Sequence, residues 1–205
     1  MALIRNSYEY TDAEKRTLRT NPVIDSKDWE KSIFKKIKLN LKQHLTQEQN
    51  QICPYCGLKF SVATCYPHIE HIVHKDNHLD FMFEPKNLAI SCPICNVNKG
   101  RKETLTDSSR TDYPTEGSSF VIIHPHFDNY SEHIELFEQI FLKAITGKGR
   151  VTIDYCNLCR MEIAEEMADQ IIMDRQGLNK KLVLRLTKEN DPQLKNQITN
   201  FIENS

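Results

Sequence analysis

Apolar residues recur at every fourth position between residues 29 and 45. The members of this pattern are Trp29, Ile33, Ile37, Leu41 and Leu45. A repeat of this length places its residues along one face of an α-helix, and Ser26 can cap the first turn with its hydroxyl oxygen. We therefore predict a helix that begins near Lys27, after a polar arm or short helix over residues 1–25.

Lysines occupy the other faces of this predicted helix: Lys31, Lys35, Lys38 and Lys42. A solvated, charged face is the common arrangement for a helix at a protein surface. The alternative is that these lysines contact the phosphate groups of a nucleic acid. The pattern alone is compatible with both interpretations.

The segment of residues 51–100 predicts a strand, a loop and a helix, in that order. Residues 69–73 are rich in β-prone side chains and predict the strand, and residues 76–85 predict the loop. The helix is expected to begin near Asn96.

The pattern beyond residue 100 is less regular. Residues 101–119 are polar and predict a long loop, whereas residues 133–146 fit a helix or a strand equally well. The other predicted elements are a strand over residues 120–123, a turn over 147–149, a strand over 150–155, and helices over 157–176 and 189–202.

Length and charge limit the class of protein. The 205 residues can form one ordinary domain or a small domain with helical additions, and we divide them into residues 1–50, 51–102 and 103–205. The 27 Lys and Arg residues face 28 Asp and Glu residues, which argues against gripping nucleic acid by net charge alone. Because no long apolar run or apolar signal core is found, we expect a cytoplasmic protein without membrane contact.

Cysteines form two Cys-x-x-Cys pairs, Cys53/Cys56 and Cys92/Cys95. Four thiolates satisfy the tetrahedral coordination of a structural Zn²⁺ ion, and buried reduced thiols are the alternative. A third pair, Cys156/Cys159, is three residues apart in a predicted helix and is interpreted as packing, as is Cys65.

The adjacent residues Glu70 and His71 lie between the two cysteine pairs. Imidazole titrates near neutral pH and suits a general base that takes a proton from water. Neighbouring side chains of a strand point to opposite faces. A bend or bulge at this point is therefore needed if both side chains are to flank one phosphate.

The combined motif resembles the zinc-containing HNH endonucleases. It consists of Cys-x-x-Cys, then Glu-His-Ile, then Asn-Leu, then Cys-x-x-Cys-Asn-x-x-Lys-Gly. The resemblance implies an α+β chain with a ββα-metal finger that holds structural zinc, embedded in a mainly helical chain with a small C-terminal α/β extension. This sequence departs from the family at residues 73–75, Val-His-Lys, where a proline is common.

The resemblance also implies roles for particular residues. His71 is the general base, and Asn87 orients that base or shapes its loop. Glu70 and Asn96 bind a catalytic Mg²⁺ or Mn²⁺ ion, with Asn96 at a position where other members carry histidine. A hard ion suits such oxygen ligands.

Further basic side chains lie close to this motif. Lys99 and His74 are expected to contact substrate phosphate, and His68 is a weaker candidate for metal or substrate. The segment from His124 to Asp128 is interpreted as a turn that ends a strand, with an approach to the active site as the alternative.

The regions outside the finger resemble the small HNH effector subunits of bacterial anti-phage systems. Septu and retron-linked systems pair such a subunit with an ATPase, so the resemblance implies an ATPase partner that contributes to nucleic-acid binding. The predicted function is metal-dependent hydrolysis of DNA, with RNA as another substrate. The alternatives are a non-catalytic zinc finger that binds nucleic acid or protein, and a redox protein that uses its thiols.

Overall fold

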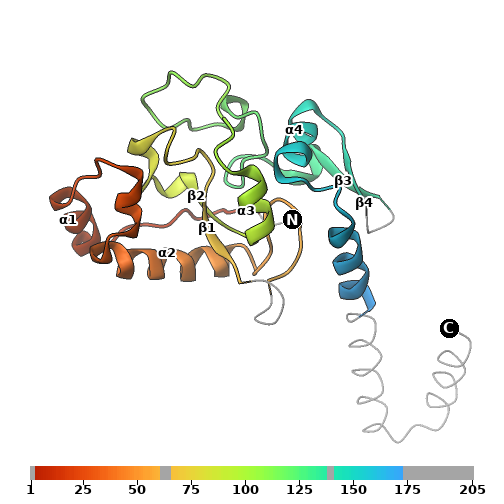
Figure 1. Cartoon of the computed structure of the whole chain (residues 1–205), viewed down its shortest axis with the longest axis horizontal. Helices are drawn as coiled ribbons and strands as arrows, with labels where there is room; N and C mark the ends of the chain where they lie inside the picture. Colours follow the sequence, from red (N-terminus) through yellow and green to blue (C-terminus); the bar gives the residue numbers. More distant parts are fainter. Residues whose placement is uncertain (1–2, 61–65, 138–140, 173–205) are drawn as a thin grey trace, which may run out of the picture. The chain divides into compact units, whose positions relative to one another are not determined.

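The computed structural model describes residues 3–60, 66–137 and 141–172. The chain divides into two compact units, residues 1–163 and 164–205, and the first is described here. Its helices and strands are α1 (Asp12–Thr20), α2 (Lys35–Glu48), β1 (His68–His71), β2 (Leu88–Ser91), α3 (Pro93–Lys99), β3 (Ile134–Phe137), β4 (Phe141–Ala144) and α4 (Gly147–Cys156) (Figure 1). None of the helices in the described ranges is long and apolar enough to span a membrane.

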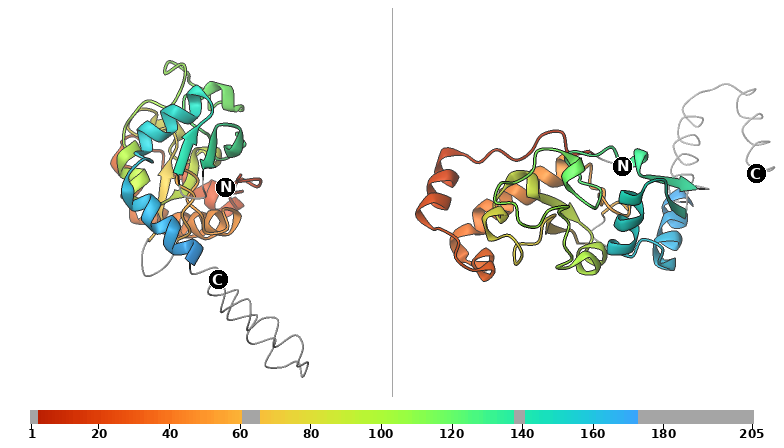
Figure 2. Two further views of the ribbon diagram at one scale, coloured as in Figure 1. Left: turned by 90° about the vertical axis from the view of Figure 1, so that its right-hand side faces the viewer. Right: turned by 90° about the horizontal axis from the view of Figure 1, so that it is seen from above.

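A β-hairpin followed by a short helix lies at the centre of the first unit. Strands β1 and β2 pair in antiparallel register, with Glu70 opposite Ala89 and His71 opposite Leu88. Helix α3 follows β2 directly, which gives the expected ββα arrangement. Figures 1 and 2 show α2 along one side of the hairpin and the segment of residues 101–120 on the other.

Helix α2 supplies the main apolar contact to the hairpin. Its buried residues are Ile37, Leu41 and Leu45, as the fourfold repeat predicted. The start of the helix was predicted wrongly, because residues 26–34 form two 3₁₀ turns before α2 begins. The buried side chain there is Phe34, while Ile33 is 50% exposed. Phe34 continues the helical spacing of Ile37 and Leu41 equally well.

The free edge of β2 is closed by the side chain of Gln49. Its amide accepts a hydrogen bond from Ile90 N at 2.7 Å and donates one to Ile90 O at 2.7 Å. Gln49 is fully buried. The amide group therefore satisfies the backbone of an edge strand in the way that a neighbouring strand would.

Both predicted elements at residues 147–155 were wrong, since the structure has α4 there. Thr146 caps this helix through a hydrogen bond from Gly149 N to its hydroxyl. The buried positions of α4 are Gly149, Thr152, Ile153 and Cys156. This spacing is helical, but only two of the four residues are strongly apolar, so the alternating residues 151, 153 and 155 dominated the sequence pattern.

Other predictions were partly right. The strand predicted at 69–73 occupies His68–His71, and α3 begins at Pro93 rather than near Asn96, because the thiol of Cys92 caps it. Within the segment 133–146, which fitted helix or strand, the described residues form the antiparallel pair β3 and β4. The predicted strand at 120–123 is reduced to one bridge between Phe120 and Leu105. Apart from that bridge, the predicted loop at 101–119 contains turns, irregular backbone and a short 3₁₀ segment.

The predicted helix at residues 157–176 begins later than expected. Asn157 has a left-handed conformation (φ 49°) and ends α4, and helix is found over residues 161–172. The predicted helix over residues 189–202 and Cys65 lie outside the described residues.

Candidate active site and zinc site

The four cysteines of the two pairs form one buried cluster. Their sulfur atoms lie within 4.8 Å of one another, and those of Cys56 and Cys92 are 3.9 Å apart. Tetrahedral zinc with Zn–S bonds of about 2.3 Å requires sulfur separations of about 3.8 Å. The geometry and the donor atoms therefore fit a zinc ion that joins the first knuckle to the start of α3.

Arg160, which follows the end of α4 in the chain, lies next to this cluster. Its guanidinium nitrogens lie 3.8 and 4.0 Å from the sulfur of Cys95 and donate to the carbonyls of Cys156 and Asn157. A cation at this position offsets the negative charge of a tetrathiolate site. Cys156 is buried as predicted, whereas Cys159 is exposed, so the two do not pack together on one buried face.

The imidazole of His71 is held by two contacts. Its Nε2 atom lies 3.1 Å from the carbonyl oxygen of Met82, and its ring packs edge-on against Trp29 with a centroid separation of 4.5 Å. A carbonyl can only accept a hydrogen bond, so Nε2 carries the proton and Nδ1 keeps a lone pair. Burial lowers the pKa of His71 to about 3, which leaves the ring neutral near pH 7.

Glu70 lies on the other face of β1 from His71. Strand β1 keeps a regular register with β2 through both residues. The bend or bulge that would let Glu70 and His71 flank one phosphate is therefore absent from this strand. The carboxylate is 2.9 Å from the ammonium of Lys99 on α3, and both side chains are buried. Lys99 also donates to the carbonyl of Ile72 at 3.2 Å.

This ion pair changes the interpretation of Lys99. The side chain was predicted to contact substrate phosphate, but it is only 1% exposed and neutralises a buried carboxylate. Removing either partner would leave an unpaired buried charge. Lys99 is therefore a structural residue that joins α3 to β1.

The chemistry of a divalent-ion site is only partly present. A carboxylate from Glu70 and an amide from Asn96 are suitable oxygen donors for a hard cation. Glu70 Oε1 is buried and forms no well-directed hydrogen bond, yet it already faces the Lys99 ammonium. The donor types thus fit the ion, while the position beside Glu70 is held by a protein cation.

Asn87 organises the loop between β1 and β2. Its side-chain oxygen accepts from Val73 N at 2.7 Å, and its nitrogen donates to the carbonyls of Val73 and Phe81 at 3.0 and 2.9 Å. The next residue after Phe81 is Met82, whose carbonyl holds His71. Asn87 therefore acts on the shape of the loop that positions the imidazole.

A second layer of residues, which the sequence motif did not identify, supports Asn87. The hydroxyl of Tyr113 lies 3.2 Å from Asn87 Oδ1 and 2.8 Å from His124 Nε2. His126 Nε2 lies 2.9 Å from the carbonyl of Leu88 on β2. The His124–Asp128 segment thus reaches the finger, which was the alternative interpretation of that segment, and no local signal marked Tyr113.

His74 and His68 lie at different places around the finger. His74 accepts a hydrogen bond from Asp76 N at 3.1 Å and is half-buried, and burial lowers its pKa. His68 is exposed at the start of β1. Contact of either residue with substrate stays a prediction.

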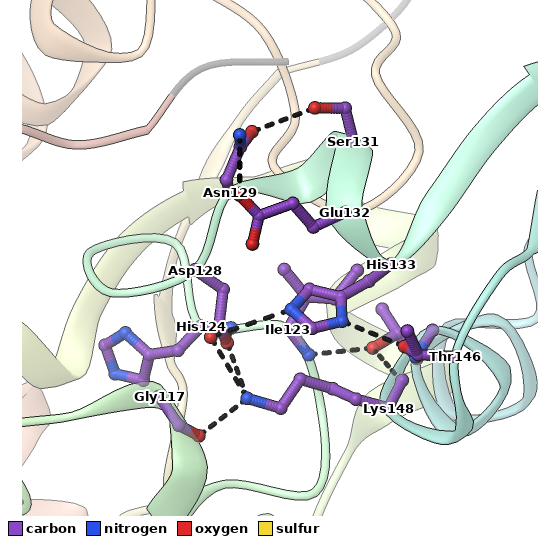
Figure 3. Close-up of polar contacts among 12 residues, drawn as sticks. Gly117, Ile123, His124, Asp128, Asn129, Ser131, Glu132, His133, Thr146 and Lys148 are labelled. Carbon is purple, nitrogen blue, oxygen red and sulfur yellow. Dashed lines mark hydrogen bonds and ion pairs between the residues drawn. The ribbon is translucent and has the colours of Figure 1, made fainter.

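A polar cluster holds α4 against the loop that precedes β3 (Figure 3). The ammonium of Lys148 lies 2.8 Å from Asp128 and donates to the carbonyl of Gly117 at 2.6 Å. The His133 ring lies 2.8 Å from the Thr146 hydroxyl. The cluster therefore holds in place the residues next to His124 and His126, the two histidines that contact Tyr113 and β2.

Comparison with known protein families agrees with this geometry. Residues 53–102 match the family model of the HNH endonucleases. This segment is an HNH domain. The match spans both cysteine pairs, the hairpin and α3, and so covers the predicted zinc ligands and His71 within one known domain type.

The chain is also similar to a curated protein beyond the HNH domain. It is 28% identical over 122 residues to the Septu protein PtuB from Bacillus thuringiensis. The matched region covers 60% of this chain and 42% of that protein. This chain therefore corresponds to less than half the length of that relative.

Proposed function

We propose that this protein is an endonuclease that hydrolyses phosphodiester bonds with His71 as the general base. The observation that carries the proposal is the hydrogen bond between His71 Nε2 and the carbonyl of Met82. It fixes the tautomer in which Nδ1 is free to accept a proton. A base that is neutral at the working pH and oriented by a rigid carbonyl is suited to activate water.

The protein's own groups act at each stage of this reaction. His71 Nδ1 takes a proton from the attacking water, and the Met82 carbonyl then stabilises the positive imidazolium through the Nε2 proton. Trp29 holds the plane of the ring. Asn87 keeps the loop that carries Met82 in place through its bonds to Val73 and Phe81.

A Mg²⁺ or Mn²⁺ ion is part of the proposal. When bound, such an ion polarises the scissile phosphate and stabilises the leaving oxygen. Glu70 and Asn96 are the proposed ligands. For Glu70 to serve in this way, Lys99 must release the contact that it makes at 2.9 Å.

The similarity to the Septu protein PtuB supports a wider proposal. We propose that the substrate is DNA, with RNA as a second possible substrate class, and that the protein acts in bacterial anti-phage defence together with an ATPase partner. The HNH domain at residues 53–102 contains the proposed base and the proposed metal ligands. The partner would supply part of the nucleic-acid binding that the net charge of −1 does not provide.

The test compares cleavage by the parent protein, His71→Ala and Lys36→Gln. Matched plasmid DNA and RNA are incubated with each protein in the presence of Mg²⁺ or Mn²⁺, with no added ion as the blank. We expect ion-dependent nicking that falls by about 10²- to 10⁴-fold in His71→Ala and is retained in Lys36→Gln, whose changed residue is exposed on α2. A zinc-loaded, folded parent protein that cleaves neither substrate would instead favour a non-catalytic zinc finger.

A further inference from the structure

An open groove lies between α2 and the start of β1. Its volume is about 600 Å³. The residues that line it include Trp29, Lys35, Lys42, Tyr66, Ile69 and Asn96. The groove thus brings together α2, the residues just before it, the entry to β1 and one residue of α3.

The charge of this groove is positive, although the chain as a whole is nearly neutral. Three lysines of α2 line it, against the single carboxylate of Glu30. Lys38 is partly engaged, since its ammonium donates to Trp29 O at 2.7 Å and lies 3.3 Å from Glu30. Lys35 and Lys42 remain to attract an anionic ligand.

The two available lysines are arranged like the phosphates of one nucleic-acid strand. Lys35 and Lys42 are two helical turns apart, which is about 10 Å along the axis. One strand of a duplex carries a phosphate for about every 3.4 Å of its axis, so the lysines are about three phosphate intervals apart. An evenly spaced anion of this kind fits the groove better than a compact one.

An aromatic side chain stands beside the second lysine. Tyr66 is 69% exposed, and the ammonium of Lys42 lies 3.6 Å from its ring centroid. The lysine lies over the ring, and the large exposed fraction of the side chain makes it available for stacking with a base. Basic side chains that alternate with an exposed aromatic ring are typical of surfaces that bind a nucleic-acid strand.

The groove ends next to the proposed general base. Trp29 and Ile69 both line it. Trp29 packs against the His71 ring, and Ile69 lies two residues before His71, on the same face of β1. Asn96, a proposed ligand of the divalent ion, lines the groove as well.

We infer that this groove binds a single nucleic-acid strand along α2, with Lys35 and Lys42 on its phosphates and Tyr66 under a base. The inference rests on the proposed nuclease function, because the strand would then pass the His71 site. It also gives the nearly neutral chain a local basic surface for substrate. The strand is unpaired DNA or RNA, because a base that is paired and stacked inside a duplex cannot lie on Tyr66.

The test measures binding in a His71→Ala background, so that cleavage does not consume the probe. A labelled single-stranded DNA, its duplex and the matching RNA are titrated at several salt concentrations. The variants are Lys35→Gln with Lys42→Gln, Tyr66→Ala, and Lys36→Gln as the control. Lys36 is an exposed lysine of the same helix that does not line the groove.

We expect the double lysine variant to weaken binding by about tenfold or more and to reduce the slope of log K against log salt by about 1.4 to 1.8, the value for two lost phosphate contacts. Lys36→Gln should bind like the parent. A larger loss for Tyr66→Ala on single strands than on duplex supports an unpaired strand as the ligand, and equal losses would contradict the stacking of a base on Tyr66. Equal affinity and salt slope for the double variant and Lys36→Gln would overturn the inference.

The two proposals fail in different ways. If the parent protein binds through the groove but cleaves nothing with Mg²⁺ or Mn²⁺, the nuclease function is wrong and the groove stands. If cleavage depends on His71 while the double lysine variant binds and cleaves like the parent, the groove assignment is wrong and the nuclease function stands.

Discussion

At the residue scale, the side chain of Asn87 has the most demanding environment near the proposed base. It receives one backbone N–H and gives two hydrogen bonds to backbone carbonyls, while fully buried. The sequence motif marked Asn87 but left open whether it orients the base or shapes the loop. Its backbone partners are Val73 and Phe81 and its side-chain partner is Tyr113, so in this structure it acts on His71 only through the loop.

Asn87→Asp tests this arrangement with almost no change in shape. A carboxylate in place of the amide would face the carbonyl oxygens of Val73 and Phe81 with no proton to share. Two buried hydrogen bonds become repulsive, and we expect a loss of about 3 kcal/mol or more in the free energy of unfolding. Denaturant unfolding measures this loss. The control is Asn98→Asp, because the side-chain amide of Asn98 donates an exposed hydrogen bond to the carbonyl of Ile94. This substitution should change stability by less than about 1 kcal/mol. Similar losses at both sites would contradict the account.

At the element scale, α4 shows why some helices escape sequence analysis. Its buried positions include Gly149 and Thr152, which carry little apolar signal. The glycine is required by tertiary contact, since a Cβ at residue 149 would lie 2.0 Å from the carbonyl oxygen of His133. Such a requirement depends on a chain segment more than ten residues away, and no local pattern contains it.

The two glycines in the first turn of α4 give a matched pair of substitutions. Gly149→Ala places a methyl group against backbone that cannot move easily, and we expect a destabilisation of at least about 2 kcal/mol. Gly147→Ala meets no atom within 4 Å and should leave stability unchanged or raise it by up to about 1 kcal/mol. Thermal unfolding of both variants measures the difference. Equal melting temperatures would show that α4 does not lie against His133 as described.

At the scale of the whole molecule, the ββα fold with its four cysteines was predictable from the sequence. The residues from distant segments that pack against the site were not. Cysteine spacing and the Glu-His, Asn-Leu and Cys-Asn motifs predicted the ββα fold, because those signals are local. Trp29 and Tyr113, which contact the His71 ring and Asn87, come from segments far away in the sequence. The burial of Lys99 against Glu70 could not be predicted from the sequence, because it depends on the packing of α3 on β1.

Buried imidazoles from different parts of the fold make stability depend on pH. Burial lowers the pKa of His71 to about 3 and that of His126 to about 4, while an unfolded histidine titrates near 6.5. The unfolded chain therefore binds more protons below pH 6.5, so the free energy of unfolding falls as the pH falls. Each such histidine contributes up to about 1.4 kcal/mol per pH unit between about pH 6 and its folded-state pKa.

His71→Gln, which cannot titrate, should flatten this dependence by about that amount per pH unit between pH 6 and 4. His68→Gln, at an exposed position, should leave the slope unchanged. Denaturant unfolding at a series of pH values gives the slopes, and acid release of zinc affects all three proteins alike. A parent slope identical to that of His71→Gln would mean that the imidazole is not held neutral inside the fold.

The most direct measurement is the single-turnover cleavage rate of His71→Gly, with and without added imidazole, in zinc-loaded protein with Mg²⁺ or Mn²⁺. We predict a rate about 10²- to 10⁴-fold below that of the parent and a partial recovery that grows with the concentration of neutral imidazole. A His71→Gly protein that cleaves as fast as the parent without imidazole would contradict the assignment of His71 as the base.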